Sequence, residues 1–311
     1  MMKESRKIVI GTRRSPLALR QTEIIRRALQ KIWPDMEFET LTIVTDGDRI
    51  TNLPLSLIGG KGLFTKALED RMLDGTIDLA VHSLKDLPTA LPEGLSIGAV
   101  PSREDPADVL LSRTTLQLDE LPAGAVIGTS SVRRSSQLAM ARPDLCIKDI
   151  RGNVDTRFRK LDEGQYDAII LAAAGLNRLG LSGRVVQRLD WYHAAGQGAL
   201  AVETRAGDHK LMELLAPLNV TVTMQAVSAE RAFLHGLGGG CHVPIGVRSR
   251  LEGSILVLEG MVASPDAARC RVGCERGLPG EAADIGERLA RVLLGQGAAD
   301  ILESAQNERT Q

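Results

Sequence analysis

The sequence predicts an α/β protein of two lobes with mixed, mainly parallel sheets, followed by a small C-terminal α/β domain. The length of 311 residues fits two or three domains. Short apolar runs alternate with helical patterns up to about residue 219, as in sheets covered by helices on both faces. A strand, a Gly-Thr turn and a helix also follow one another twice, which indicates two comparable lobes.

The first of these patterns lies near the start of the chain. Residues 8–12 form a β-branched run that ends in Gly-Thr, and Ser15 and Pro16 then provide an N-cap and an N1 proline. We therefore expect a strand followed by a helix that continues to about residue 31.

The second pattern repeats this strand ending at residues 126–129. Ser130 and Ser131 can cap a helix over residues 132–142. In both patterns two consecutive arginines lie near the start of the helix, which places basic side chains at the expected strand ends.

A further similarity follows each pattern. Residues 74–81 and residues 163–170 both indicate a helix that ends at a glycine and leads into an apolar strand. A chance likeness of two strand–helix–strand units and a duplicated lobe both explain it. In either case, ligands should bind at the carboxyl ends of the strands, where the glycine turns lie.

The chain should cross between the lobes at residues 101–106 and return at residues 195–199. The expected domains are a first lobe of residues 1–101 plus 199–219, a second lobe of residues 106–195, and a C-terminal domain of residues 220–311 that carries Cys241.

After residue 219 the pattern is that of a small α/β domain. Residues 221–234 have a helical period, with four apolar residues on one side: Val222, Ala226, Ala229 and Phe233. Alternation over residues 255–262 predicts a strand, and residues 282–294 and 298–303 predict two closing helices.

The charge distribution favours a small anionic ligand. The formal net charge is −1, so no global field attracts nucleic acid or a membrane. Two Trp, two Tyr and four Phe are too few for a base-stacking surface. Basic residues instead gather beside glycines at loop-to-helix junctions, although solvated faces would give the same pattern at any one of them.

We expect a cytoplasmic protein that acts as a monomer. No apolar run approaches the roughly 20 residues that span a bilayer, and residues 1–7 are charged and lack the apolar stretch of a signal peptide. The four cysteines show no framework spacing, so disulfides are not expected. Cys270 and Cys274 could form a zinc site with Cys241 and His242. Their spacing differs from the C-x2-C pair that is usual in zinc sites, so we predict no metal.

Cys241 directly follows three glycines. Because these residues have no Cβ, backbone and ligand can approach its sulfur closely. A thiol on such a loop should be exposed rather than packed, which is typical of a covalent role. An ordinary free cysteine beside a helix end explains the pattern as well.

Asp86 comes directly after an apolar strand, in the segment HSLKDLP of residues 82–88. A carboxylate at the carboxyl end of a strand can accept N–H groups and offset a developing positive charge, and Lys85 would favour its ionised form. The alternative is a surface turn with an ion pair. His82 belongs to the strand and is expected to be packed.

Three segments combine guanidinium groups, hydroxyls and helix N-termini, which suits carboxylates or phosphates. They are residues 129–134, residues 151–153 with Arg157, and Arg13 with Ser15. Residues 59–62 lack the spacing of a P-loop, and Leu63 replaces the hydroxyl residue that magnesium needs. The residues alone therefore indicate a two-lobed binder of a polycarboxylate or phosphorylated small molecule.

These segments resemble those of the porphobilinogen deaminase family. They follow in the family's order and span most of the chain: residues 11–19 (GTRRSPLAL), 59–64 (GGKGLF), 80–88 (AVHSLKDLP), 128–134 (GTSSVRR), 151–157 (RGNVDTR), 196–198 (GQG) and 239–246 (GGCHVPIG). The part after residue 246 matches only loosely.

The resemblance implies lobes like those of periplasmic binding proteins and a transferase of tetrapyrrole (haem) biosynthesis. A dipyrromethane cofactor would be joined by a thioether to Cys241, and it would come from the substrate or from a preformed tetrapyrrole chain. Four porphobilinogen units would be added head to tail with loss of ammonia. Hydrolysis would then release hydroxymethylbilane.

The resemblance also implies roles for individual residues, and Asp86 matches the family's catalytic aspartate. The positions that match its cofactor-binding residues are Cys241, Ser83, Lys85, Thr129, Ser131, Arg133, Arg134, Arg151 and Gly152. Those that match its substrate-binding residues are Arg13, Ser15, Lys61, Phe64, Arg157 and Gln197.

Two departures from the family pattern stand out. Asp46 lies where relatives often carry a basic or small residue, so no binding role follows for it. Residues 189–195 are shorter than usual and lack the common proline, which leaves open the shape of the return between the lobes. The main rival interpretation is a non-catalytic anion-binding or sensor protein of the same fold, and a nucleic-acid binder is a more distant one.

Overall fold

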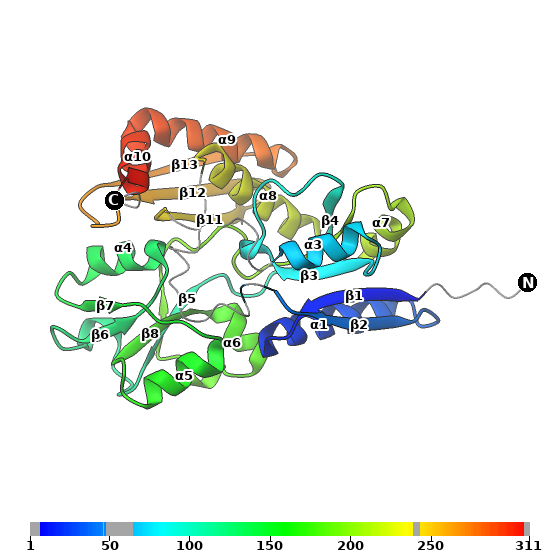
Figure 1. Ribbon diagram of the computed structural model, residues 1–311. Helices are drawn as coiled ribbons and strands as arrows, with labels where there is room; N and C mark the ends of the chain where they lie inside the picture. Colours follow the sequence, from blue (N-terminus) through cyan, green and yellow to red (C-terminus); the bar gives the residue numbers. More distant parts are fainter. Residues whose placement is uncertain (1–6, 46, 48–64, 239–242, 308–311) are drawn as a thin grey trace, which may run out of the picture. The chain divides into compact units, whose positions relative to one another are not determined.

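The computed structural model describes residues 7–45, 47, 65–238 and 243–307 (Figure 1). Contacts divide them into two compact units. The first holds the described residues up to 104 together with residues 198–224, and the second holds residues 105–197 and those from 225 onward. Within these ranges, no helix is both long and apolar enough to cross a membrane.

A five-stranded sheet forms the centre of the first unit, in the order β2-β1-β3-β10-β4. Its strands are β1 (Ile8–Arg13), β2 (Phe38–Ile43), β3 (Leu79–Ser83), β4 (Leu95–Ala99) and β10 (Leu200–Arg205). β1 is parallel to β2 and β3, whereas β10 is antiparallel to β3 and β4. One strand of the sheet therefore runs against the others, as expected for a mixed, mainly parallel sheet.

Helices cover both faces of this sheet. Val81 of β3 belongs to the apolar cluster that includes side chains of α1 (Pro16–Ile32) and α7 (His209–Leu215). The neighbouring Ala80 packs with side chains of α3 (Lys66–Leu73). Because successive side chains of a strand point to opposite faces, α1 and α3 lie on opposite sides of the sheet.

The second unit contains a sheet of the same design, in the order β7-β6-β8-β5-β9. Its strands are β5 (Asp108–Ser112), β6 (Val126–Gly128), β7 (Cys146–Lys148), β8 (Ala168–Ala172) and β9 (Gln187–Leu189). β6 is parallel to β7 and β8, and β5 is antiparallel to β8 and β9. The order and directions match those of the first sheet strand for strand, which confirms two lobes of one fold class.

The two lobes also share a side-chain contact. In the first, the Asp78 carboxylate accepts the Val9 N–H at 2.9 Å. In the second, the Asp167 carboxylate accepts the Val126 N–H at 2.8 Å. Each aspartate lies between a glycine with a positive φ, Gly75 or Gly164, and the strand that follows this glycine. The similarity seen in the sequence therefore extends to equivalent contacts.

Helices α4 (Val132–Ala141), α5 (Val154–Asp162) and α6 (Ala173–Leu179) belong to the second lobe. Ser131 is the N-cap residue of α4, as expected, but its side chain makes no cap hydrogen bond. The Ser130 hydroxyl lies 2.9 Å from the Ile150 carbonyl and accepts the N–H of the same residue at 3.0 Å, so it fastens a neighbouring loop instead.

The C-terminal part forms a small α/β domain, as predicted. Its elements are α8 (Thr221–Gly236), β11 (Ile245–Glu252), β12 (Ile255–Ala263), β13 (Cys270–Gly277), α9 (Ala282–Leu293) and α10 (Ala299–Asn307). Phe233 is fully buried against Gly260, where an added Cβ would lie 2.4 Å from the ring. Val222, expected on the side of Phe233, is 52% exposed, and Val227 is buried instead.

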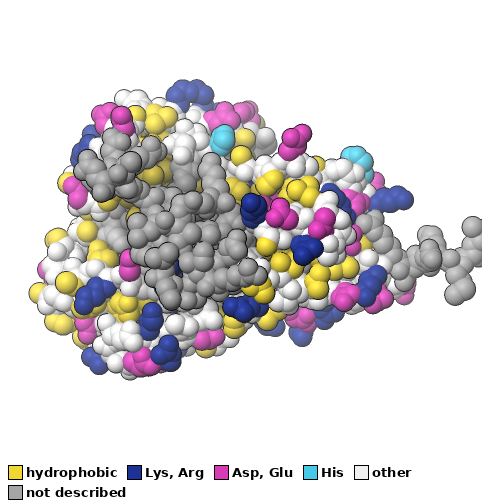
Figure 2. Space-filling model, in the orientation of Figure 1, with side chains coloured by type: hydrophobic (Ala, Val, Ile, Leu, Met, Phe, Trp, Pro, Cys, Tyr) yellow, Lys and Arg dark blue, Asp and Glu magenta, His cyan; other side chains and the backbone are white. Residues whose placement is uncertain are grey.

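Short helical turns connect these elements. They are η1 (Leu84–Asp86), η2 (Leu118–Glu120), η3 (Ser182–Arg184), η4 (Ala216–Leu218), η5 (Pro279–Glu281) and the π-helical turn η6 (Leu294–Ala298). On the described part of the face in Figure 2, basic and acidic side chains are interspersed. This mixture agrees with the formal net charge of −1.

Candidate active and cofactor site

A turn at the carboxyl end of β3 carries Lys85 and Asp86. The turn η1 is fixed by Leu84, which is fully buried and donates its N–H to the Ala199 carbonyl at 3.0 Å. Asp86 is exposed and Lys85 is half-buried. The carboxylate is therefore presented at the edge of the sheet where ligands of such folds bind.

Ser83, the last residue of β3, is held from helix α1. Its Oγ accepts a hydrogen bond from the Gln21 Nε2 at 2.8 Å. Gln21 is itself buried, so the hydroxyl has a fixed position. A serine hydroxyl that accepts one bond still has its own proton to donate to a ligand.

Arg13 and Ser15 lie at the same edge of the first sheet. Arg13 ends β1, which is parallel to β3 and adjacent to it. Ser15 is the N-cap of α1 as predicted, and its Oγ accepts the Ala18 N–H at 3.3 Å. The carboxyl ends of two neighbouring parallel strands thus bring a guanidinium, hydroxyls and the Asp86 turn to one side of the lobe.

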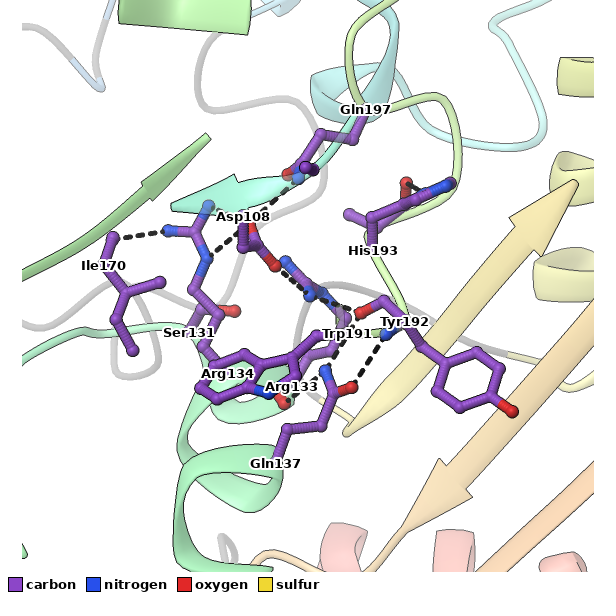
Figure 3. A network of polar contacts seen from close by, with 12 residues as sticks. Asp108, Ser131, Arg133, Arg134, Gln137, Ile170, Trp191, Tyr192, His193 and Gln197 are labelled. Atoms are coloured by element: carbon purple, nitrogen blue, oxygen red, sulfur yellow. Dashed lines mark hydrogen bonds and ion pairs between the residues drawn. The ribbon is translucent and has the colours of Figure 1, made fainter. Parts of the chain in front are cut away.

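The second lobe contains a buried charge network around Asp108 (Figure 3). Arg133 Nη1 is 2.6 Å from Asp108 Oδ2, and Arg134 Nη2 is 2.7 Å from Asp108 Oδ1. Arg134 also donates through Nη1 to the Ile170 carbonyl at 3.0 Å. All three charged side chains are buried, with Asp108 fully so.

The two guanidinium groups decide the ionisation of Asp108. Burial alone would raise the pKa of this carboxyl, but Arg133 and Arg134 outweigh burial and hold the pKa well below its ordinary value. Burial lowers the pKa of Arg133 in turn. With one carboxylate shared by two guanidinium groups, the network carries one surplus positive charge.

Gln197 completes this network from the return segment. Its Nε2 donates to Asp108 Oδ1 at 2.9 Å and to the Pro106 carbonyl at 2.7 Å. Sequence reasoning selected Gln197 but missed Asp108, because the start of an apolar strand carries no local signal of ion pairing. The structure shows that Asp108 orients both guanidinium groups.

Two further arginines add positive charge near this network, and in the described part of the chain neither forms an ion pair with an acidic side chain. Burial, followed by repulsion from Arg134 and Arg151, lowers the pKa of Arg157 to about 10. Arg151 Nη1 is buried and has no hydrogen-bond partner among the residues that the structure describes. Gly152 has a φ of 109°, and an added Cβ would lie 2.6 Å from the Thr156 side chain, so this turn requires glycine. A buried guanidinium donor without a partner suits an anionic ligand.

Removing the Arg157 charge is expected to stabilise the ligand-free protein. In the folded state the lowered pKa disfavours protonated Arg157, and this cost applies at every pH below about 10. Arg157→Gln should raise the free energy of unfolding by about 1 kcal/mol, once solvent screening of the partly exposed side chain is allowed for. Denaturant unfolding at pH 7 measures this change.

Arg142→Gln provides the matched control. Arg142 donates to the Leu118 and Leu121 carbonyls at 2.5 and 2.8 Å and pairs with Asp144. Its replacement should lower the free energy of unfolding by about 1 kcal/mol, because buried acceptors lose their donors. If both variants lost the same free energy of unfolding, the inference of surplus positive charge at Arg157 would be contradicted.

Thr129 and Ser131 lie in the turn before helix α4. Thr129 is buried, and its Oγ1 accepts the Ser131 N–H at 3.2 Å. The Thr129 N–H donates to the Lys148 carbonyl at 3.0 Å. These contacts fix the turn from which the two consecutive arginines of α4 start.

The short segment before Gly196 is clamped on two sides, which gives the return its shape. Gln137 accepts the Tyr192 N–H at 2.8 Å and donates to the Tyr192 carbonyl at 2.9 Å, and Arg133 donates to the same carbonyl at 2.6 Å (Figure 3). Arg248 lies 4.8 Å from the centroid of the Tyr192 ring and donates to the Trp191 carbonyl at 3.1 Å. Gln137, which the sequence did not single out, therefore ties α4 to the return segment.

The structure places most predicted site residues in two groups. The first unit holds Arg13, Ser15, Ser83, Lys85 and Asp86. The second unit holds Thr129, Ser131, Arg133, Arg134, Arg151, Gly152, Arg157 and Gln197. Lys61, Phe64, Cys241 and Asp46 lie outside the described residues.

Fold and charge together define a class: a two-lobed α/β protein with a small third domain and a cluster of arginines in its second lobe. Comparison with known families identifies the class more closely. The sequence model "Porphobilinogen deaminase, dipyromethane cofactor binding domain" matches residues 8–213, and "Porphobilinogen deaminase, C-terminal domain" matches residues 224–295. The chain belongs to the porphobilinogen deaminase family.

Curated relatives agree over nearly the whole chain. A porphobilinogen deaminase of Syntrophobacter fumaroxidans is 50% identical, covering 96% of this chain and 97% of the relative. One of Brevibacillus brevis is 50% identical, covering 97% and 98%. Among solved structures, a lipoprotein of the YaeC family from Enterococcus faecalis has a TM-score of 0.42 and 15% identity, covering 68% of this chain and 90% of that one.

Proposed function

We propose that this chain catalyses the hydroxymethylbilane synthase reaction in tetrapyrrole biosynthesis. Four porphobilinogen units would be joined head to tail with loss of ammonia on a dipyrromethane cofactor, and hydrolysis would release hydroxymethylbilane. The family is one of transferases, and its first matched domain binds this cofactor. The observation that carries the proposal is the positive charge that Arg151 and Arg157 add beside the Asp108 network, together with a buried Arg151 donor that no described residue satisfies.

The donor set of the second lobe fits the cofactor. Each pyrrole of a dipyrromethane bears an acetate and a propionate, so the group brings several carboxylates to the protein. Arg133, Arg134 and Arg151 would bind them together with Thr129, Ser131 and the backbone of Gly152. Ser83 and Lys85 would supply further contacts from the first lobe. When bound, the cofactor supplies the pyrrole carbon to which the first substrate unit is added.

Cys241 would hold this group through a thioether. It follows three glycines, so ligand and backbone can approach the sulfur closely. The thiolate is the nucleophilic form of cysteine, which suits the formation of such a bond. A permanent covalent anchor also explains how a growing chain would stay bound while units are added.

Asp86 would act on the reacting pyrroles. Loss of ammonia leaves an electron-poor pyrrole, and its nitrogen carries positive charge while the new bond forms. The exposed Asp86 carboxylate can accept the pyrrole N–H and offset this charge. In this role Asp86 would transfer no proton to a carbon atom, so its effect would be electrostatic.

The remaining predicted residues would bind incoming porphobilinogen. Its carboxylates would contact Arg13, Ser15, Lys61 and Arg157, and the further substrate-binding positions are Phe64 and Gln197. The lobe limits given above, a cytoplasmic location, a monomeric state and the absence of a nucleic-acid partner belong to the same proposal. Light scattering of the purified enzyme tests the monomer.

The proposal is tested by the mass and turnover of the purified protein. Freshly isolated protein should be heavier than its sequence by one dipyrromethane. It should also consume porphobilinogen and release ammonia and hydroxymethylbilane. A non-catalytic sensor of the same fold would bind porphobilinogen without releasing ammonia, and active protein of bare-chain mass would falsify the covalent cofactor.

A further inference from the structure

Three buried titratable side chains lie between helix α3 and the first sheet, apart from the site described above. They are Glu69 on α3, His82 on β3 and Glu203 on β10, which are 5%, 4% and 0% exposed. His82 alternates with Ala80 along β3 and so faces α3, against which Ala80 packs. Glu203 faces the same helix, because the adjacent Val202 packs on the α1 side.

A proton must lie between His82 and Glu203. The His82 Nε2 is 2.9 Å from Glu203 Oε2, an ion-pair contact. Among the described residues, neither of these atoms nor Glu203 Oε1 makes a hydrogen bond to any other group. Lone pairs on both atoms would repel at this distance, so either the imidazole or the carboxyl carries a proton that the other accepts. A fully buried carboxylate without this contact would be strongly unfavourable.

Glu69 completes the cluster as a third carboxyl group. Burial raises the pKa of Glu69, and the charges of Glu203 and Asp70 raise it further, whereas His82 lowers it. The net rise in the pKa of Glu69 shifts this carboxyl toward its neutral form and so reduces the repulsion between two buried carboxyl groups.

The cluster adjoins the turn that carries Lys85 and Asp86. The pairing of β3 with β10 ends at Ser83 and Leu200, so the contact between His82 and Glu203 ties the two strands on the α3 side close to that end. On the other face, Gln21 holds Ser83. The end of β3 is thus fastened from both faces immediately before the turn.

We propose that His82 and Glu203 are a positioning pair that fixes the Asp86 turn through their shared proton. The inference rests on the proposed function, because it concerns the placement of Asp86 for that reaction. Neither side chain reaches the surface, so the pair would act through the backbone of β3 rather than on the ligand. A displacement of Asp86 by a fraction of an ångström would then misplace its carboxylate relative to the pyrrole nitrogen.

Steady-state kinetics of the holoenzyme tests this role. Glu203→Gln and His82→Gln should each lower kcat by about 10- to 100-fold, because catalysis depends steeply on position. The KM for porphobilinogen should stay within about threefold of the wild-type value, since the carboxylate-binding arginines are untouched. Thr204→Val is the matched control: Thr204 follows Glu203, is fully buried and donates to the Asp78 carbonyl at 3.2 Å.

The control should lower thermal stability without lowering kcat. Wild-type kcat in folded Glu203→Gln, or a kcat loss in Thr204→Val of the same size, would overturn the positioning role. If Glu203→Gln does not fold, His82→Gln is judged by the same criterion.

Nitrogen-15 spectra of the histidine rings supply an independent readout. His82 Nε2 of the wild-type protein should give the chemical shift of a hydrogen-bonded nitrogen, whether it carries the shared proton or accepts it from Glu203. An Nε2 shift typical of a nitrogen outside any hydrogen bond would overturn the inference. The spectrum does not depend on turnover. A wild-type protein that forms no hydroxymethylbilane but shows the hydrogen-bonded Nε2 would therefore contradict the proposed function alone.

Discussion

Cys241→Ala is expected to yield a protein of bare-chain mass that does not turn over porphobilinogen. Without the sulfur, no thioether forms, and the growing chain has no permanent anchor. The arginines of the second lobe remain, so the variant should still bind carboxylated pyrroles reversibly. Intact mass spectrometry of the purified variant measures the loss of the added cofactor mass, and an ammonia-release assay measures the loss of turnover.

Cys146→Ala is the control for this experiment. Cys146 is a free thiol that is exposed on β7, so it reports any adventitious modification of a surface thiol. Its replacement should leave both the added mass and the turnover unchanged. If Cys241→Ala kept the adduct, the attachment would be elsewhere, and the interpretation of the glycine loop would be wrong.

The fold could be predicted from the sequence because its signals are local. Ser15 and Pro16 mark the start of α1 by capping chemistry, which the structure confirms. Glycines with positive φ, such as Gly75 and Gly164, mark the ends of helices before apolar strands. These signals repeat in both lobes, so the lobes could be predicted even though their strands pair across long separations.

The charge network could not be predicted, because its pairs are distant in sequence. Asp108 precedes its partner Arg133 by 25 residues and Arg134 by 26. At the start of an apolar strand, Asp108 is indistinguishable from a solvated end residue. The clamp at Gln137 is similar, since an amide within a helix indicates its backbone partner only once the return segment is placed beside it.

Family resemblance and geometry contribute different information about the arginines. Resemblance assigns Arg133 and Arg134 to ligand carboxylates, whereas the structure shows both bound to Asp108. The two statements are compatible because the pair keeps a surplus positive charge and is held rigidly. Preorganised guanidinium groups lose less conformational entropy on binding.

Asp86→Asn is expected to reduce turnover at least about 100-fold, the scale of losing one positioned electrostatic group. The amide can still accept a pyrrole N–H, but it carries no negative charge to offset the developing cation. Because the arginines and the cofactor anchor are unchanged, the variant should keep its dipyrromethane and accumulate substrate-derived adducts. Rapid quench followed by intact mass spectrometry measures these adducts, and steady-state assays measure turnover.

Glu93→Gln separates this effect from a general change of charge. Glu93 is another exposed carboxylate of the first unit, and it is not part of the turn after β3. Its replacement should leave turnover within about twofold of the wild type, since an exposed charge acts weakly through water. Near-normal turnover in Asp86→Asn would instead mean that the arginine cluster alone stabilises the reacting pyrrole, and the exposed carboxylate would have no catalytic role.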